Sequence, residues 1–139
     1  MKKALIIFQN KNTATKKYGE EIAEFLNNRG LSAELIPINN FEPKKLEETD
    51  YLLLSGWSNS SLFSIKKPDS EWVSFVKTLP SLKGVKTALF TTYKFFSGGM
   101  FRSMKKYLKK KTENLEYALK SRDGSLSISD KLVLNDFIK

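Results

Sequence analysis

The sequence predicts a doubly wound α/β domain, in which helices cover both faces of a parallel sheet. Short apolar runs without strict polar alternation indicate strands that are buried on both faces. Helical patterns separate these runs, and such alternation is typical of parallel sheets with right-handed crossovers. The 139 residues are enough for one substantial core and too few for two ordinary ones. We therefore expect a single domain over residues 1–139.

Four strands and a crossover helix are predicted first. The apolar runs are bounded by polar or turn-forming residues and lie at residues 4–8, 33–38, 51–55 and 87–91. Between the first two runs, apolar residues at helical spacing predict a helix from Lys16 to Asn28, which Asn28-Arg29-Gly30 ends. One helical turn is expected from Pro43, because proline is favoured at the first position of a helix.

Three further helices and a last strand are expected after residue 68. One helical stripe ends at Pro80, and a second follows Gly98-Gly99. A final strand is predicted at 115–119, a turn at 122–124 and a closing helix at 129–138. The candidate caps are Asp69 or Ser70 for the first of these helices and Ser127 or Ser129 for the last. The two stripes that we assign to the core are Trp72, Phe75, Val76 and Leu79, and then Phe101, Met104, Tyr107 and Leu108.

The sequence contains no cysteine and no histidine. It therefore excludes thiol nucleophiles, disulfides, zinc sites built on these residues and imidazole acid–base catalysis. The apolar run at residues 4–8 is too short for a signal-peptide core, and nothing in the sequence approaches a membrane span. A cytoplasmic location is expected.

Positive charge is concentrated in one segment of this basic protein, whose formal net charge is +9. Residues 100–111 contain no acid, and a solvated helix face with a lysine-rich end has this composition, since cations favour the helix C-terminus. Such a segment can also attract nucleic acid, anionic lipid or an acidic protein. We favour the solvated face and keep docking as the alternative. The cations are Arg102, Lys105, Lys106, Lys109, Lys110 and Lys111.

Three loops follow the carboxyl ends of the first, third and fourth strands, at residues 9–15, 56–68 and 92–99. In a doubly wound sheet such loops converge on the ligand crevice. The first loop is rich in amide and hydroxyl groups and leads into a helix, whose positive end suits a phosphate. The other two loops carry Trp57 and Tyr93, whose rings can sandwich a planar group. The sequence thus predicts a cofactor site at this edge.

The first loop resembles the phosphate loop of the flavodoxins and flavodoxin-like FMN proteins. Their motif is an aromatic residue, a small residue and then Ser/Thr-x-Thr-Gly-Asn-Thr. Here the aromatic residue is Phe8, a threonine replaces the motif glycine, and Thr15 keeps the final threonine. The resemblance spans nearly the whole chain, because the later strands, the loop with Trp57 and the closing helix fall where a short-chain flavodoxin has them. The motif positions after Phe8 are filled by Asn10, Lys11, Asn12, Thr13, Ala14 and Thr15.

This resemblance implies a five-stranded sheet in the order 2-1-3-4-5 that holds FMN noncovalently. It implies that the FMN phosphate lies at residues 10–15 and that Trp57 and Tyr93 stack on the isoalloxazine ring. It also implies an electron carrier between redox proteins rather than a substrate-specific enzyme, and the basic surface predicts that these partners are acidic. The remaining residues that would face the cofactor are Ser58, Asn59, Thr92, Lys94, Gly98 and Gly99.

Other functions of the same fold are excluded by missing residues. A receiver domain needs an acidic cluster where Gln9-Asn10 and Ser55-Gly56 stand, and a low-molecular-weight phosphatase needs a cysteine. A dinucleotide site needs a glycine-rich first turn, which residues 9–15 lack. The alternative that remains is a cofactor-free module whose basic helix docks on an acidic protein or nucleic acid. Thr15 is also expected to cap the first helix.

Overall fold

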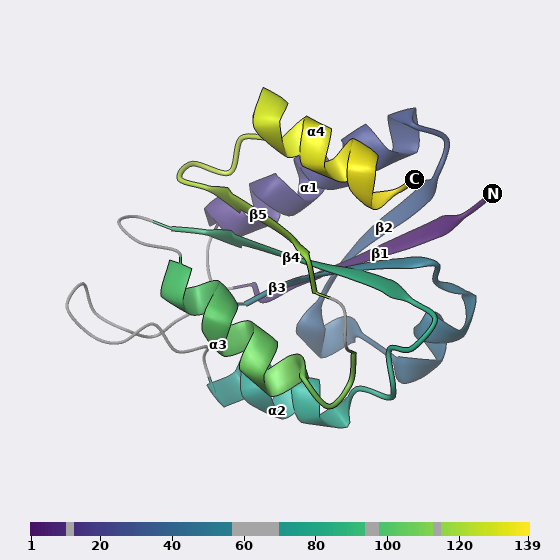
Figure 1. Cartoon of the computed structure of the whole chain (residues 1–139), viewed down its shortest axis with the longest axis vertical. Helices are drawn as coiled ribbons and strands as arrows, with labels where there is room; N and C mark the ends of the chain where they lie inside the picture. The colour runs from purple at the N-terminus through teal and green to yellow at the C-terminus, as the bar shows by residue number, and fades with distance from the viewer. Residues whose placement is uncertain (11–12, 57–69, 94–97, 113–114) are drawn as a thin grey trace.

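The computed structural model describes residues 1–10, 13–56, 70–93, 98–112 and 115–139. Five parallel strands form one sheet in the order β2-β1-β3-β4-β5, which confirms the expected order (Figure 1). The helices are α1 (Thr13–Asn28), α2 (Ser70–Thr78), α3 (Gly98–Leu108) and α4 (Ile128–Phe137). The strands are β1 (Lys3–Phe8), β2 (Ser32–Pro37), β3 (Tyr51–Ser55), β4 (Lys86–Thr92) and β5 (Tyr117–Ser121).

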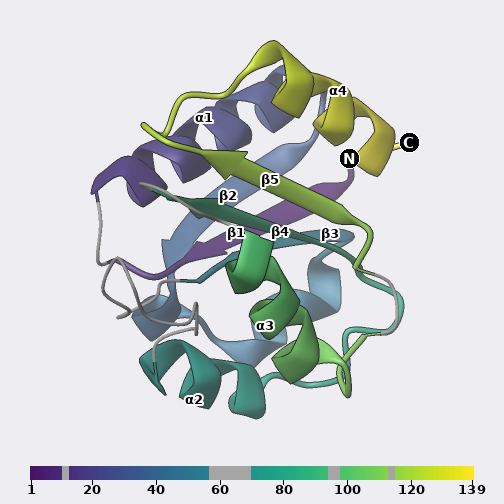
Figure 2. The same cartoon turned by 60° about the vertical axis from the view of Figure 1, so that its left-hand side comes forward.

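Helices cover both faces of the sheet, as expected for a doubly wound fold. Figures 1 and 2 show α1 and α4 on one face and α2 and α3 on the other. The three inner strands are buried almost throughout, so their side chains supply both cores. Side chains of α1 and α4 pack against one set of them, around Tyr18 and Phe137. Side chains of α2 and α3 pack against the other, around Trp72 and Met104.

The core assignments of the two apolar stripes are confirmed with one exception. Trp72, Met104 and Leu108 are fully buried, whereas Tyr107 is 42% exposed at the flank of α3. The helical turn from Pro43 forms as a 3₁₀ helix, η2 (Pro43–Glu48), and a second short one, η1 (Ile38–Asn40), precedes it. No helix in the described ranges is long and apolar enough to cross a membrane.

Besides one-residue shifts at the ends of β1, β2 and β4, three expected boundaries are wrong. The first helix starts at Thr13 and not at Lys16, which places Thr15 inside its first turn, so Thr15 is not its cap. The last strand is Tyr117–Ser121, two residues later than predicted, because Tyr117 pairs with Ala88 while Leu115 packs against the core of α2 and α3. The closing helix starts one residue early, at Ile128. Its cap is Ser127, one of the two caps expected, and Asp130 completes a capping box.

Candidate cofactor site at the carboxyl edge of the sheet

Three segments meet where the strands end. They are the first turn of α1, the end of β4 with the following Tyr93, and the loop between β5 and α4. Two contacts join them directly, since the hydroxyls of Thr15 and Thr92 lie 2.6 Å apart and the Tyr93 N–H donates to the Ser121 carbonyl at 3.1 Å. The structure therefore brings together residues of the first and third predicted loops, and adds a segment that the sequence did not predict.

The start of α1 has the chemistry of an anion site. Its first turn contains no acidic residue, and the N-terminal end of a helix carries a partial positive charge. Thr15 is buried, with 1% of its surface exposed. Two hydroxyls contain two hydrogens, and the contact between Thr15 and Thr92 uses one of them, so the pair still has an O–H to donate. These groups fit a phosphate, which accepts hydrogen bonds from both backbone and hydroxyl donors.

The β5–α4 loop is pressed against this first turn at a glycine. Gly124 has a φ of +87°, a conformation that side chains other than glycine rarely adopt. A Cβ built on Gly124 would also overlap the backbone carbonyl oxygen of Ala14. Both constraints require glycine at this position, and the close approach lets the loop form a wall of the candidate site.

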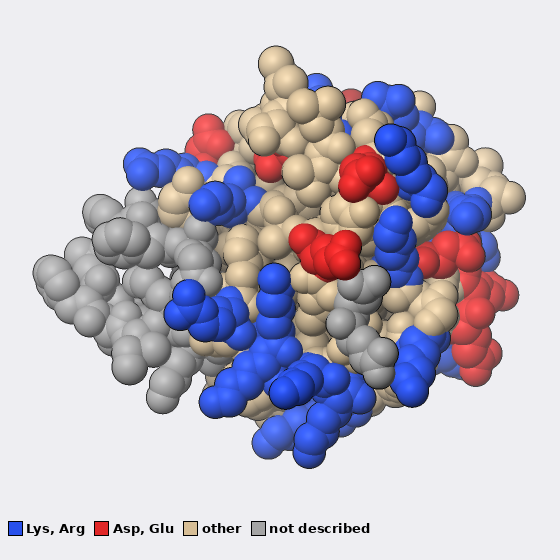
Figure 3. All heavy atoms as spheres, in the orientation of Figure 1, with Lys and Arg blue, Asp and Glu red and all other residues tan. Residues whose placement is uncertain are grey.

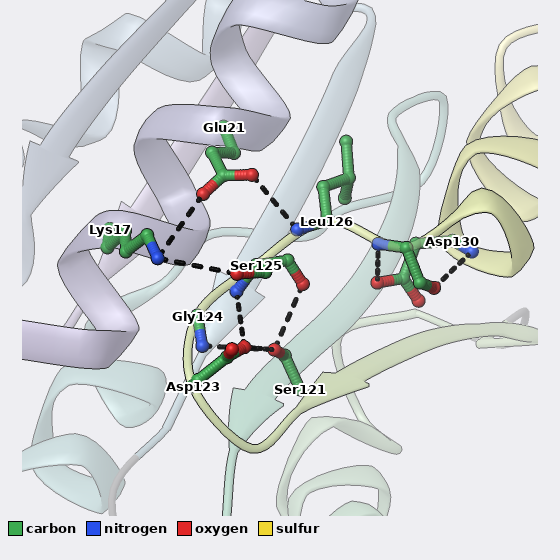
Figure 4. A network of polar contacts seen from close by, with 9 residues as sticks. Lys17, Glu21, Ser121, Asp123, Gly124, Ser125, Leu126 and Asp130 are labelled. Carbon is green, nitrogen blue, oxygen red and sulfur yellow. Dashed lines mark hydrogen bonds and ion pairs between the residues drawn. The ribbon is translucent and has the colours of Figure 1, made fainter.

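Hydrogen bonds fix the shape of that loop (Figure 4). The Ser121 hydroxyl accepts from the Gly124 N–H at 3.0 Å, and the Asp123 carboxylate accepts from the Ser125 N–H at 2.9 Å. Because the hydrogen bond from the Ser125 backbone stabilises the charged form, the pKa of Asp123 lies below its usual value. These hydrogen bonds tie Ser121, Asp123, Gly124 and Ser125 to one another and constrain the path of the loop.

Two side chains of α1 bind the same loop from outside. Lys17 Nζ donates to the Ser125 hydroxyl at 3.3 Å, and Glu21 Oε1 accepts from the Leu126 N–H at 3.0 Å (Figure 4). Lys17 and Glu21 lie 3.9 Å apart across one helical turn. From the sequence alone Lys17 is expected to be a solvated lysine at the start of the helix, with a contact to a phosphate as the alternative. Its contact with Ser125 joins residues that are 108 apart in the chain, so no local pattern indicates it.

Tyr93 and Trp72 provide aromatic groups near the strand ends. The guanidinium of Arg122, in the β5–α4 loop, lies 5.6 Å from the centre of the Tyr93 ring, a cation–π distance. Trp72 is fully buried next to Gly56, which follows β3, and its indole Nε1 has no hydrogen-bond partner among the residues that the structure describes. A buried donor without an acceptor is uncommon. Trp72 lies next to the residue that follows β3, and Tyr93 follows β4 directly.

The predicted site residues divide into those that the structure describes and those outside its described ranges. Asn10 follows β1 and is exposed, Thr13, Ala14 and Thr15 form the first turn of α1, and Thr92 ends β4 next to Tyr93. The backbone of Gly98 and Gly99 begins α3. Lys11, Asn12, Trp57, Ser58, Asn59 and Lys94 lie outside the described residues, so their predicted roles stay predictions.

A hollow also lies at the opposite edge of the sheet. Its volume is about 560 Å³, and its lining includes Leu82, Lys86, Glu116 and Tyr117. The Lys86 ammonium lies 5.1 Å from the centre of the Tyr117 ring. This hollow is at the amino ends of β4 and β5, at the opposite edge of the sheet from the converging loops.

The strand order, the two helical layers and the site at the carboxyl edge define a flavodoxin-like fold. Solved structures of the same fold include flavodoxin 1 from Bacillus cereus, with a TM-score of 0.71 and 17% identity over 98% of this chain and 95% of that one. The two-electron reduced flavodoxin of Megasphaera elsdenii gives a TM-score of 0.76 at 14% identity, over 96% of each chain. A Fusobacterium nucleatum flavodoxin bound to flavin mononucleotide gives a TM-score of 0.60 and 17% identity over 99% of this chain and 95% of that one.

These structures are similar to this chain in fold, and their identities are too low to show more than the fold. No protein-family model matches the sequence, and no curated protein matches it in sequence. The flavodoxin-like fold is therefore established by its structure.

Proposed function

We propose that this protein binds FMN noncovalently at the carboxyl edge of its sheet, with the phosphate at residues 10–15. The observation that carries the proposal is the first turn of α1, which has no acid and whose Thr15 hydroxyl is paired with Thr92. Hydroxyl and backbone donors at a helix start can hold a phosphate without a cationic clamp. A structure of the same fold, the Fusobacterium nucleatum flavodoxin, contains flavin mononucleotide, which also supports the choice of ligand.

We further propose that the isoalloxazine ring stacks between Trp57 and Tyr93. In this proposal backbone groups at the second and third loops meet the edge of the ring. The guanidinium of Arg122 lies 5.6 Å from the Tyr93 ring centre, a cation–π contact that helps to orient this ring. The ring-facing residues of the proposal are Ser58, Asn59, Thr92, Lys94, Gly98 and Gly99.

The function that follows is electron transfer between protein partners in the cytoplasm. Bound FMN supplies the redox chemistry, and the protein supplies binding, orientation and the electrostatic field around it. No side chain is required as a nucleophile. The Megasphaera elsdenii flavodoxin of the same fold has been solved in its two-electron reduced form, which supports a redox role for a protein of this shape. A net charge of +9 favours acidic partners.

Titration of the purified apo-protein with FMN tests this proposal, with quenching of flavin fluorescence as the readout and riboflavin as the control. We expect FMN to bind at least about tenfold more tightly than riboflavin, because only FMN has the phosphate that α1 would hold. Absence of FMN binding at tens of micromolar, about the range in which a weak site still shows, would overturn the proposal.

A second candidate function is a cofactor-free docking module, and the observation that favours it is the charge on α3. Arg102, Lys105 and Lys106 are exposed on this helix, and Lys109 and Lys110 are exposed in the turn after it. A protein without FMN that still binds an acidic partner through these residues would have this function.

A further inference from the structure

The excess of positive over negative charge in this protein comes from one stretch of its sequence. Of the 24 Lys and Arg residues, ten lie between Trp72 and Thr112, where there is no Asp or Glu. The other fourteen are balanced by all 15 acids of the chain. The net charge of +9 therefore comes from the segment that forms α2, β4 and α3.

Much of this charge lies on one face of α3 and the turn that follows it. Met104 and Leu108 face the core and are fully buried. Arg102, Lys106 and Lys109 follow at spacings of four and three residues, which puts them on the opposite, outer face. Figure 3 shows Lys and Arg side chains gathered over α3 in the lower half of the view. We call this surface the α3 face, and its members are Arg102, Lys105, Lys106, Lys109 and Lys110, all exposed.

The α3 face is held in place by contacts at its end. Lys111 turns inward, and its ammonium donates to the Leu79 carbonyl at 2.6 Å. The Lys111 carbonyl accepts from the Leu82 N–H at 2.8 Å. The turn that carries Lys109 and Lys110 is thus fixed to the segment between α2 and β4. Among the described residues, no ion pair with an acid neutralises the cations of the α3 face.

An aromatic side chain lies at the flank of the α3 face. Tyr107 is 42% exposed, and its ring meets Trp72 edge-on at 6.4 Å between centroids, so its orientation is set by a fully buried residue. Tyrosine is enriched in the cores of protein interfaces, because its ring buries a large area at low entropic cost. An ordered, half-exposed tyrosine beside lysines is typical of a protein-binding surface.

We propose that the α3 face is the docking site for an acidic surface of a redox partner protein. The identity of the partner as a redox protein rests on the proposed function, whereas the docking itself does not require FMN. Because α3 begins at the carboxyl edge, near the candidate cofactor site, a partner lying along α3 has one end beside that site. Docking here would combine recognition with a short path for electrons.

The extent of the surface favours a protein over nucleic acid. The 11 residues of α3 span about 16 Å, which matches the patch of a standard protein interface better than the track of a duplex. A nucleic acid longer than α3 would also contact regions outside residues 72–112, where the acids balance the cations and no net attraction is expected. The face also holds a single arginine, the residue that most often reads bases, among lysines that act as point charges.

Binding of a plant-type ferredoxin, chosen as an acidic redox protein, tests the proposal, with basic cytochrome c as the opposite probe. The α3 variant carries Lys105→Gln, Lys106→Gln and Lys109→Gln. The control variant carries Arg29→Gln, Lys44→Gln and Lys131→Gln, which removes the same charge from exposed positions elsewhere. Affinities are measured by titration of apo-protein and FMN-loaded protein, at about 10 mM and 0.15 M salt, after circular dichroism shows that both variants are folded.

We expect the wild-type protein to bind ferredoxin at low salt and not cytochrome c. The α3 variant should lose about tenfold or more in affinity and in association rate, and the control variant about twofold or less. Tyr107→Ala should weaken binding at both salt concentrations, because its contribution is burial and not charge.

Three results would overturn the proposal. One is equal loss in the α3 and control variants, which would mean attraction by net charge alone. Another is failure of the wild-type protein to bind ferredoxin at low salt. The third is retention of duplex DNA or anionic vesicles at 0.15 M salt with a dissociation constant below about 1 µM, tighter than ordinary non-specific DNA binding. Ferredoxin binding without FMN binding would overturn only the proposed cofactor, and would leave the docking site in place.

Discussion

The two helical layers of this protein are held to the same sheet in different ways. In the layer of α1 and α4, polar contacts link the helices to each other and to the sheet. The buried Tyr18 hydroxyl of α1 donates to Asp130 of α4 at 2.8 Å, and the Tyr51 hydroxyl of β3 donates to the Ile138 carbonyl at 2.9 Å. In the layer of α2 and α3, apolar packing around Trp72 dominates, and the cations of the α3 face are exposed.

This difference matches the two roles that we propose for the protein. Directional hydrogen bonds fix the relative position of α1, α4 and the β5–α4 loop, and so hold the first turn of α1, where we propose that the phosphate binds. Apolar packing uses the inner face of α3, so its outer face is available for cations. Each prediction below tests one side of this comparison.

The largest effect is expected at the junction of the β5–α4 loop with α1. Gly124→Ala should destabilise the protein by about 3 kcal/mol, because it combines a left-handed backbone with overlap of the Ala14 carbonyl. Gly84 has nearly the same φ, +88°, but no atom lies within 4 Å of its added Cβ, so Gly84→Ala should cost only about 1 kcal/mol. Urea unfolding measures both. Equal losses of stability would mean that the β5–α4 loop moves away from α1 to accommodate the added methyl group, and that it does not fix the position of α1.

A buried hydrogen bond is expected to have the next largest effect. Tyr18→Phe should cost about 2 kcal/mol, since it removes a hydrogen bond to a carboxylate inside the α1 and α4 layer. Tyr117 donates to Asp136 of α4 at 2.9 Å on the surface, and Tyr117→Phe should cost less than about 1 kcal/mol. Thermal unfolding measures the stability of both variants. Equal losses of stability would contradict the comparison.

The same tyrosine makes the stability depend on pH. Burial and the bond to Asp130 raise the pKa of Tyr18 above its ordinary value. Its contribution is therefore complete below the unfolded pKa of about 10 and is lost as the pH rises above it. Wild-type stability should fall above about pH 10, and Tyr18→Phe should flatten that fall. Urea unfolding between pH 8 and 11 measures it, and parallel curves for the two proteins would count against the account.

A moderate effect is expected on ligand preference. Thr92→Val should reduce FMN affinity about tenfold and leave riboflavin affinity unchanged, because Thr15 loses the hydroxyl that orients it. Thr91→Val is the control, since the Thr91 hydroxyl donates to the Thr92 carbonyl, and no hydrogen bond joins it to α1 among the residues that the structure describes. If both variants lost FMN affinity equally, the hydroxyl pair would have no specific role.

The smallest effect concerns Asp123, whose pKa is lowered mainly by the Ser125 backbone N–H. A lowered pKa contributes stability that is present above the unfolded value, about 3.9, and lost as the pH falls through the folded value. Asp123→Asn should therefore lessen the loss of stability below about pH 4. Acid unfolding followed by circular dichroism measures the effect, with Glu48→Gln, which disrupts the surface pair with Lys3, as the comparison.

The fold could be predicted from the sequence because each inner strand corresponds to one continuous apolar run. The positions of β1, β3 and β4 could be read to within one residue, since each is a buried run with polar ends. The start of α1 was misplaced because its first turn, Thr13-Ala14-Thr15, has no apolar stripe and is polar enough to resemble a loop. The bounds of β5 were predicted two residues too early, because three of its five side chains are not buried and its pairing with β4 decides where it lies.

The candidate site was harder to predict than the fold. The first and third loops were identified, but the β5–α4 loop was recognised only as a turn at residues 122–124. Its role depends on contacts such as Lys17 with Ser125, which are 108 residues apart in the chain. Local patterns cannot indicate such a pair. Trp72 was assigned to the core, where it is, but its buried indole N–H next to Gly56 became visible only in the structure.

The central claim is that FMN binds at the carboxyl edge of the sheet, with its phosphate at the start of α1. Amide chemical shifts of the isotope-labelled apo-protein, followed by NMR during FMN addition, test it most directly. We predict the largest changes at Thr13–Thr15, Thr92 and Gly124, and smaller changes at Thr13–Thr15 with riboflavin. Changes confined to Leu82, Lys86 and Tyr117, around the hollow at the opposite edge, or no changes at all, would contradict the claim.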